Sequence, residues 1–224
     1  MQIEPELVAS LPALDYGVSG TVMHRSCAIV GNSGTLLGGK QGEEIDRHDA
    51  VLRINYAPVK GWEVDVGSKT TYDFSNRENA RRILKTNVKM RDSTLLFFEV
   101  GSPTNRKQMF VPLVKKFPDR KIHFLHPGFV VRGLDLWFDL KSEVEARRHT
   151  KYHDKPMSGL FAVLFMTQVC TSVDLYGFEA YTKKRANSPY HYFDKVQGVT
   201  SVHSFDLAID VFRLLNDAFP ITIK

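Results

Sequence analysis

The stretch from Cys27 to Phe74 constrains the fold most strongly, because short apolar runs alternate there with polar loops. The apolar run Cys27–Gly31 stops at the turn Asn32-Ser33-Gly34, and the run Ala50–Ile54 stops at Asn55. Short apolar runs that end at turn residues are typical of buried strands. The spacing fits neither the dinucleotide-binding fingerprint nor the P-loop, so the first turn indicates either a phosphate-binding loop that presents backbone N–H groups or an ordinary turn.

The composition fits one globular domain. The chain has 224 residues, of which 43% are hydrophobic and 25% charged, and this is enough for a single α/β domain with a full core. No apolar run approaches about 18 residues, so we expect no membrane contact by the chain as given. The net charge of +5 favours anionic partners, but the basic residues form no single stripe with interleaved aromatics, so we expect no nucleic-acid partner.

Strand and helix patterns alternate along the rest of the chain. We expect a third strand to open within Val66–Thr71, and Ser75 with Glu78 forms a capping box that predicts a helix after it. The other predicted strands are 94–99, 121–125 and 172–176, and the other predicted helices are 108–117, 134–148, 157–170 and 204–218. This alternation predicts an α/β fold: a single Rossmann-like domain with a mostly parallel sheet between helices. Residues 27–224 would form this domain, and residues 1–26 an N-terminal arm or the remnant of a stem.

Four ordered motifs point to a family. After Cys27 the chain contains Gly-Asn-Ser-Gly, Glu-Ile-Asp, His-Asp, Arg-Ile-Asn-x-Ala-Pro and Asp-Val-Gly-Ser-Lys-Thr-Thr, in that order. This order resembles the large sialyl motif of animal-type sialyltransferases (glycosyltransferase family 29). The segment Pro156–Phe178 resembles the small motif, Tyr190–Asp194 resembles the third motif, and His203 stands where the very small motif has its histidine.

The resemblance implies a GT-A-variant sialyltransferase fold and an inverting, metal-independent transfer of sialic acid from CMP-sialic acid to a hydroxyl of an acceptor glycan. No cofactor is expected, and the sequence has no Asp-x-Asp of the kind that holds a metal on pyrophosphate donors. The single charge of a phosphate diester can be met by hydrogen-bond donors alone. The family location is the Golgi lumen. Two alternatives stay open: a transferase for another CMP-activated acid such as Kdo, and a CMP-binding protein that has lost turnover.

The resemblance also assigns residues to the site. Those that would bind the CMP-sugar are Asn32, Ser33, Asn55, Ser158, Gly159, Phe178 and Tyr192. His191 would donate to the leaving phosphate, with help from Tyr192 or Tyr190. Without the family, turn capping, helix packing or burial in the core would explain the same asparagines, glycine and phenylalanine, and the tyrosines and His191 would form a surface cluster.

His203 would be the general base. It precedes Ser204, a good helix cap, and an amphipathic helix whose positive end disfavours the imidazolium form. The competing interpretation is that His203 only caps or packs that helix. Ala208 replaces the glutamate that the family usually has five residues after this histidine, and Asp206 is the predicted substitute that orients the ring. Met157 replaces the usual Ser or Thr of the small motif, which puts one nucleotide contact in doubt.

Two further expectations concern cysteines and a loop. The only two cysteines, Cys27 and Cys170, are consistent with two buried thiols or with one bridge, and the resemblance implies a Cys27–Cys170 disulfide. The basic, polar segment Tyr181–Pro189 lies between the predicted nucleoside-lining Phe178 and His191, and it predicts a lid that orders on ligand binding.

Overall fold

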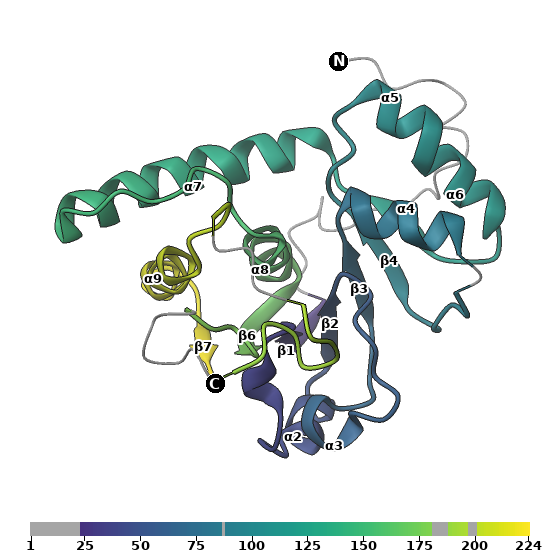
Figure 1. Ribbon diagram of the computed structural model, residues 1–224, viewed down its shortest axis with the longest axis horizontal. Helices are drawn as coiled ribbons and strands as arrows, with labels where there is room; N and C mark the ends of the chain where they lie inside the picture. The colour runs from purple at the N-terminus through teal and green to yellow at the C-terminus, as the bar shows by residue number, and fades with distance from the viewer. Residues whose placement is uncertain (1–22, 87, 181–187, 197–200) are drawn as a thin grey trace.

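The computed structural model describes residues 23–86, 88–180, 188–196 and 201–224. Within these residues one sheet of seven parallel strands runs through the molecule in the order β5-β4-β3-β2-β1-β6-β7 (Figure 1). The strands are β1 (His24–Val30), β2 (Ala50–Ile54), β3 (Tyr72–Ser75), β4 (Thr94–Phe97), β5 (Ile122–Phe124), β6 (Cys170–Tyr176) and β7 (Ile221–Ile223).

Helices cover both faces of the sheet. The helices α7 (Pro127–Arg148), α8 (Ser158–Val169) and α9 (Phe205–Leu215) pack on one face. The other face is covered by α2 (Gly42–Asp46), α3 (Glu63–Val66), α4 (Arg77–Lys85) and the helical run α5 (Pro103–Asn105), η2 (Arg106–Phe110) and α6 (Val111–Lys116). A short 3-10 turn, η1 (Gly34–Leu36), follows β1. Both faces of a strand are therefore apolar, as parallel sheets require.

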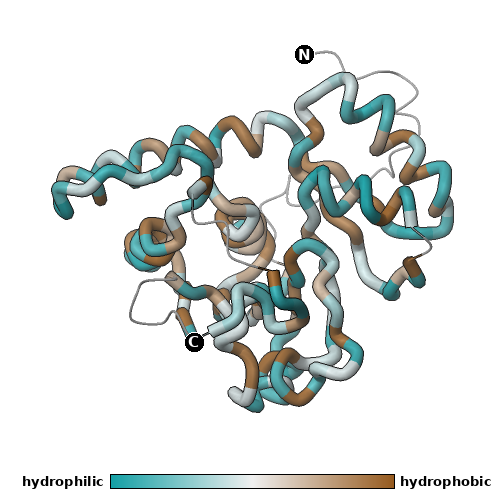
Figure 2. Tube along the Cα trace, viewed as in Figure 1, coloured by the Kyte–Doolittle hydropathy of each residue, from teal (hydrophilic) through white to brown (hydrophobic). Residues whose placement is uncertain are grey.

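Strand β1 shows the two-sided burial residue by residue. Cys27 and Ile29 pack against the α7–α9 layer, and Ala28 and Val30 pack against α2 and α3. Figure 2 shows the matching hydropathy, with hydrophobic residues on α8 at the centre of the molecule and hydrophilic residues along much of α7. The predicted single α/β domain with a parallel sheet between helices is confirmed. Among the described residues no helix is both long and apolar enough to cross a membrane.

Several predicted element boundaries are wrong. Residues 63–66 form α3, Gly67 turns at φ 72°, and β3 begins only at Tyr72, so no strand opens within 66–71. The helix predicted for 108–117 continues a helical run that begins at Pro103, and the one predicted for 134–148 begins at Pro127. β7 was not predicted, because three residues carry too little pattern. β1 begins at His24, two residues before the predicted domain boundary at residue 26. Residues 1–22 lie outside the described part of the chain, so the division into an arm and a domain stays a prediction.

Asn76, not Ser75, caps α4. Ser75 is the last residue of β3 and is fully buried. The Asn76 side chain accepts the backbone N–H of Asn79 at 3.0 Å. The capping box was therefore placed one residue too early, because the sheet pairing of Ser75 with Phe97 extends β3 through Ser75.

The predicted disulfide is confirmed. Cys27 on β1 and Cys170, which follows α8 as the first residue of β6, are bonded, with their Cα atoms 6.2 Å apart and a sequence separation of 143. Both are buried. The bridge joins β1 to the point where the chain passes from α8 into the neighbouring strand β6.

The chain order of the strands places a crevice above β1. From β1 the chain continues outward through β2, β3, β4 and β5, and then returns to the other side of β1 as β6. In parallel sheets ligands bind at such a switch point, outside the carboxyl ends of the strands. Asn32 and Asn55 follow the carboxyl ends of β1 and β2.

Candidate active site

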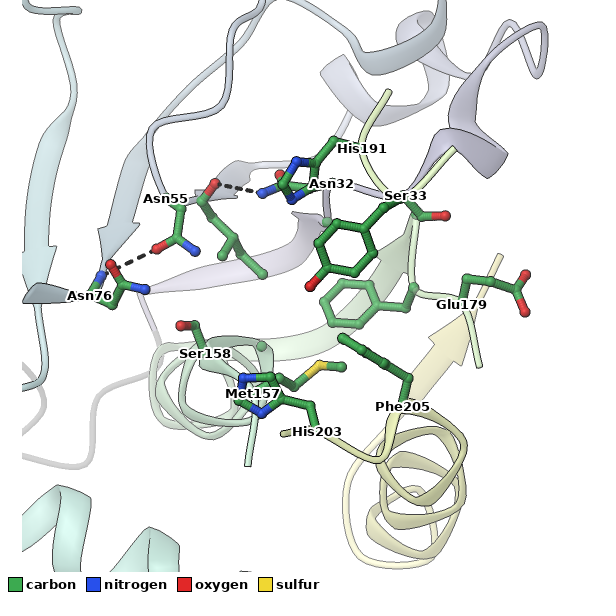
Figure 3. A pocket seen from close by; sticks show the side chains of 16 residues that line it. Asn32, Ser33, Asn55, Asn76, Met157, Ser158, Glu179, His191, His203 and Phe205 are labelled. Atoms are coloured by element: carbon green, nitrogen blue, oxygen red, sulfur yellow. Dashed lines mark hydrogen bonds between the residues drawn. The ribbon is translucent and has the colours of Figure 1, made fainter. Parts of the chain in front are cut away.

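A pocket of about 220 Å³ lies at the carboxyl ends of β1, β2, β3 and β6 (Figure 3). It brings together eight of the nine predicted catalytic and substrate-binding residues, which span most of the chain: Asn32, Ser33, Asn55, Ser158, Gly159, Phe178, His191 and His203. All four motifs thus contribute to one cavity. Met157, Tyr190 and Phe205 also line it.

Three asparagines follow three adjacent strands at the floor of the pocket: Asn32 after β1, Asn55 after β2 and Asn76 after β3. The Asn55 Oδ1 atom accepts the backbone N–H of Asn76 at 3.2 Å, so the Asn55 amide NH₂ group remains for a ligand. The Asn32 NH₂ group donates to the Ile54 carbonyl at 3.4 Å, and its buried Oδ1 has no partner among the described residues. An unmet buried polar atom suggests a missing ligand group. Asn76 was predicted only as part of a helix cap. Like Asn32 and Asn55, it is an asparagine that follows a strand, and this position could have indicated a place in the site.

The turn after β1 does not offer its backbone as a phosphate loop would. The N–H groups of Gly31, Ser33 and Gly34 already donate to the carbonyls of Tyr176, Gly177 and Pro189. The Ser33 hydroxyl accepts the N–H of Thr35 and caps η1. The groups of this turn that remain for a ligand are therefore those of Asn32 and the proton of the Ser33 hydroxyl, which only accepts in these contacts.

The N-terminus of α8 opens into the pocket with Ser158 and Gly159 in its first turn. Met157 precedes the helix and its side chain makes no capping hydrogen bond. The first N–H groups of a helix and its dipole favour an anion, and an apolar cap residue leaves them uncapped by a side chain.

A side chain at position 159 would force its neighbours to shift. A Cβ atom there would lie 2.8 Å from Cε1 of Phe178 and 3.0 Å from the sulfur of Met157. The Phe178 ring also packs edge-on against Phe212, with centroids 5.5 Å apart. Phe178, held between these contacts, presents a flat apolar face at the pocket wall, which suits a nucleobase.

His191 is paired with an acid. Its Nδ1 atom lies 2.9 Å from Oδ2 of Asp194, and its ring stacks on Phe193 at 4.8 Å. Partial burial alone would raise the pKa of Asp194, but the N–H of Val196 and the His191 ring stabilise the ionised form, and the net pKa is lowered. Because a carboxylate only accepts, His191 donates from Nδ1 and its Nε2 atom remains for the pocket.

His203 is held by the backbone. Its Nδ1 atom lies 2.9 Å from the carbonyl oxygen of Lys155, and the ring lies at the edge of Phe205. Asp206, the predicted orienting residue, does not hold this nitrogen, because the Lys155 carbonyl occupies that position. Ser204 does not cap α9 through its side chain, since its hydroxyl accepts the N–H of His153 at 2.9 Å.

Tyr192 is the predicted binding residue that does not line the pocket. It is 2% exposed, packs edge-on against Trp62 and donates its hydroxyl to the carbonyl of Pro58. Burial raises its pKa to about 12. Its neighbour Tyr190 lines the cavity instead, and residues 181–187 of the predicted lid lie outside the described residues.

Comparisons with known proteins agree with this arrangement. The model of glycosyltransferase family 29 (sialyltransferase) matches residues 2–218. The CMP-N-acetylneuraminate-beta-galactosamide-alpha-2,3-sialyltransferase 1 of Sus scrofa is 35% identical over 203 residues, which cover 85% of this chain and 55% of that protein. The Homo sapiens protein of the same name is 34% identical over 204 residues, which cover 85% of this chain and 56% of that protein. The chain thus spans about half the length of the curated relatives it matches.

Solved structures give the same grouping. The crystal structure of a mammalian sialyltransferase superposes with a TM-score of 0.68 at 29% identity, covering 98% of this chain and 76% of that one. A crystal structure of a mammalian sialyltransferase in complex with Gal-beta-1-3GalNAc-ortho-nitrophenol gives 0.66 at 28% identity with the same coverage. The chain belongs to glycosyltransferase family 29, the sialyltransferases.

Proposed function

We propose that this protein transfers sialic acid from CMP-sialic acid to a hydroxyl of a galactoside, with inversion at the anomeric carbon. The observation that carries the proposal is the meeting of all four sialyl motifs in one pocket, with His203 and His191 both among its lining residues. The donor and the acceptor class follow the names of the Sus scrofa and Homo sapiens relatives.

The leaving phosphate is stabilised by donors that add no full charge. The Asn55 NH₂ group and the first turn of α8 face the site where the phosphate gains charge as the glycosidic bond breaks. His191, oriented by Asp194, supplies a further donor from Nε2 when it is protonated. Phe178 and Gly159 form the wall for the cytidine.

The acceptor hydroxyl loses its proton to His203. A carbonyl oxygen can only accept, so the neutral ring carries its proton on Nδ1, which faces Lys155, and Nε2 holds the free lone pair. The general base is thereby placed in the correct tautomer without the glutamate that Ala208 replaces. This supports turnover despite Ala208, one of the two departures, with Met157, behind the alternative of a CMP-binding protein without turnover.

The Cys27–Cys170 disulfide supports an oxidising compartment, since such bonds persist in secretory lumens and not in the cytosol. Together with the family, the disulfide supports our proposal that the protein acts in the Golgi lumen.

A donor panel tests the proposal. The purified chain is incubated with CMP-sialic acid or CMP-Kdo and with Gal-beta-1-3GalNAc, other galactosides and non-galactoside glycans, and both glycan product and released CMP are measured. We expect transfer from CMP-sialic acid to a galactoside. Transfer from CMP-Kdo alone would favour the other CMP-activated acid, and CMP binding without turnover of either donor would show a binding protein.

A further inference from the structure

The turn that carries Asn55 into the pocket has an unusual backbone. Asn55 and the next residue, Tyr56, are both non-glycine residues with positive φ, at 60° and 56°. Such conformations cost of the order of 1 kcal/mol or more each, and they persist only where the surroundings hold them. A tyrosine in this region is less expected than an asparagine. The contacts of Tyr56 therefore show what holds the turn.

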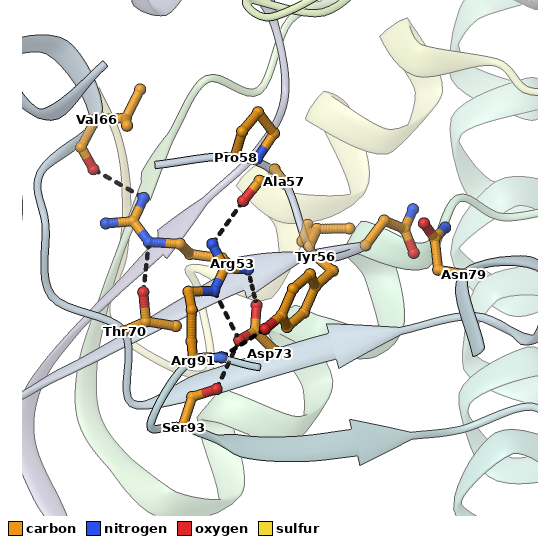
Figure 4. Close-up of polar contacts among 12 residues, drawn as sticks. Arg53, Tyr56, Ala57, Pro58, Val66, Thr70, Asp73, Asn79, Arg91 and Ser93 are labelled. Carbon is orange, nitrogen blue, oxygen red and sulfur yellow. Dashed lines mark hydrogen bonds and ion pairs between the residues drawn. The ribbon is translucent and has the colours of Figure 1, made fainter. Parts of the chain in front are cut away.

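The closest of those contacts come from Arg91, 35 residues further along the chain (Figure 4). Weaker ones join the Tyr56 hydroxyl to the Lys89 carbonyl at 3.5 Å and Arg82 to the Asn55 carbonyl at 3.3 Å. The backbone N–H of Arg91 donates to the Tyr56 hydroxyl at 2.6 Å, and its guanidinium lies over the Tyr56 ring, 4.1 Å from the centroid. The same guanidinium donates from Nη1 to the carbonyl of Ala57 at 2.7 Å. Arg91 thus contacts two consecutive residues of the turn, Tyr56 and Ala57, through three different interactions.

Asp73 fixes Arg91 in this position. The Asp73 carboxylate is fully buried on β3 and pairs with Arg91 through Nη2 at 2.5 Å and Nε at 3.2 Å, and it also accepts the Ser93 hydroxyl at 2.7 Å. A two-point ion pair holds the plane of the guanidinium as well as its position. A buried ion pair is weak evidence for stability, because desolvation offsets much of its attraction. The Arg91–Asp73 pair also fixes the geometry of the turn, and this effect suggests a role other than stability.

The geometry points to Arg91 as a positioning residue for donor binding, an inference that rests on the proposed function. Arg91 does not line the small pocket, but it lines an adjoining cavity that shares Asn32, Asn55 and His191 with that pocket. It holds Tyr56 and Ala57, and thereby keeps Asn55 in the left-handed conformation in which its Oδ1 meets the Asn76 N–H and its NH₂ group faces the donor. Relaxation of the turn to a common backbone region would swing the Asn55 side chain away from both partners.

A double-mutant cycle tests this route. CMP affinity is measured by calorimetry for the wild type, Arg91→Lys, Asn55→Ala and the double variant. Lysine keeps the charge beside Asp73 but loses the two-point geometry and cannot reproduce the contacts to both Asp73 and Ala57. We expect Arg91→Lys to weaken CMP binding about ten-fold and the double variant to bind no more weakly than Asn55→Ala, because Arg91 acts through Asn55.

A matched control separates positioning from general loss of structure. Arg106 is another buried arginine, 2% exposed, whose guanidinium donates to the carbonyls of Val100 and Gly101, away from the pocket. Arg106→Lys should leave CMP affinity unchanged. In steady-state assays Arg91→Lys should raise KM for the CMP-sugar and leave KM for the acceptor unchanged, a split that mere destabilisation would not produce.

Each other result overturns the inference. Additive effects in the cycle, or wild-type CMP affinity in Arg91→Lys, would show that Arg91 does not act through Asn55. If Arg91→Lys does not fold, Tyr56→Phe, which removes only the hydroxyl that Arg91 contacts, replaces it in the cycle with the same expected non-additivity. A wild type that does not bind CMP would refute the proposed function together with this inference, whereas a binding wild type with an additive cycle refutes this inference alone.

Discussion

The Nδ1 atom of His203 lies 2.9 Å from the carbonyl oxygen of Lys155. The segment that contains Lys155 is itself attached to α7, where the indole N–H of Trp137 donates to the carbonyl of Asp154 and Glu145 accepts the N–H of Tyr152, both at 2.9 Å. Two side chains of the long helix α7 therefore hold the backbone of the segment whose Lys155 carbonyl contacts the proposed base.

Replacement of His203 by alanine should reduce transfer at least 100-fold, the usual contribution of a general base, and change CMP affinity by less than about two-fold. Initial rates and calorimetry measure the two quantities. His153→Ala is the control, because His153 contacts Ser204 through its backbone and not its side chain. Substantial transfer by the His203 variant at neutral pH would assign the base to another residue.

Asp194→Asn should lower kcat about ten-fold with little change in the acceptor KM. Asp194 is ionised at neutral pH, because its pKa is lowered, and it holds Nδ1 of His191. An amide would weaken this charged contact at the stage where the leaving phosphate gains charge. Steady-state kinetics at saturating donor test the change, with Asp206→Asn as control. An unchanged kcat would mean that the charge of Asp194 does not contribute to the function of His191.

Gly159→Ala should weaken CMP binding at least ten-fold while the protein stays folded. The added methyl group would push Phe178 or Met157 aside, because both lie within about 3 Å of the new atom. Gly101→Ala is the matched control, since a Cβ atom there meets nothing within 4 Å. Equal CMP affinity of the two variants would mean that the nucleoside does not rest on this wall.

Loss of the disulfide should lower the free energy of unfolding. In the chain-entropy model a bridge across about 144 residues contributes roughly 5 kcal/mol. Urea denaturation of the Cys27→Ala/Cys170→Ala variant, compared with the wild type, measures the difference. Thiol titration of the denatured, unreduced wild type should find no free thiol, and two free thiols would contradict the bridge.

His123 should make stability fall at acid pH. Burial, and to a smaller extent Lys121, lowers its pKa to about 4, below the value of about 6.5 in an unfolded chain. As the pH falls, the unfolded state therefore takes up the proton first. The contribution of the neutral His123 ring to stability is fully present above pH 6.5 and is lost as the pH falls toward 4. Between pH 7.5 and 4.5, His123→Gln should lose about 1 to 2 kcal/mol less than the wild type in urea denaturation, after allowance for solvent screening. Equal losses would show that another group titrates.

Much of the fold followed from local patterns. Buried parallel strands need apolar side chains on both faces, so runs such as Cys27–Gly31 and Ala50–Ile54 were recognisable without their partners. Asn32 and Asn55 directly follow those runs, which placed them at one edge of the sheet before the strand order was known. The cysteine pairing came from the resemblance.

The orientation of the site residues and the partners of their side chains depended on contacts between distant segments. Tyr192 and Tyr190 stand in one motif, yet only Tyr190 lines the pocket, because the Tyr192 hydroxyl finds the Pro58 carbonyl 134 positions earlier in the chain. The partner of His203 is a carbonyl, and every residue has one, so no side-chain pattern could indicate Lys155. The sequence by itself determined which groups stand at the ends of the strands; the tertiary structure alone decided which way each group faces, because orientation is set by neighbours that are remote in the chain.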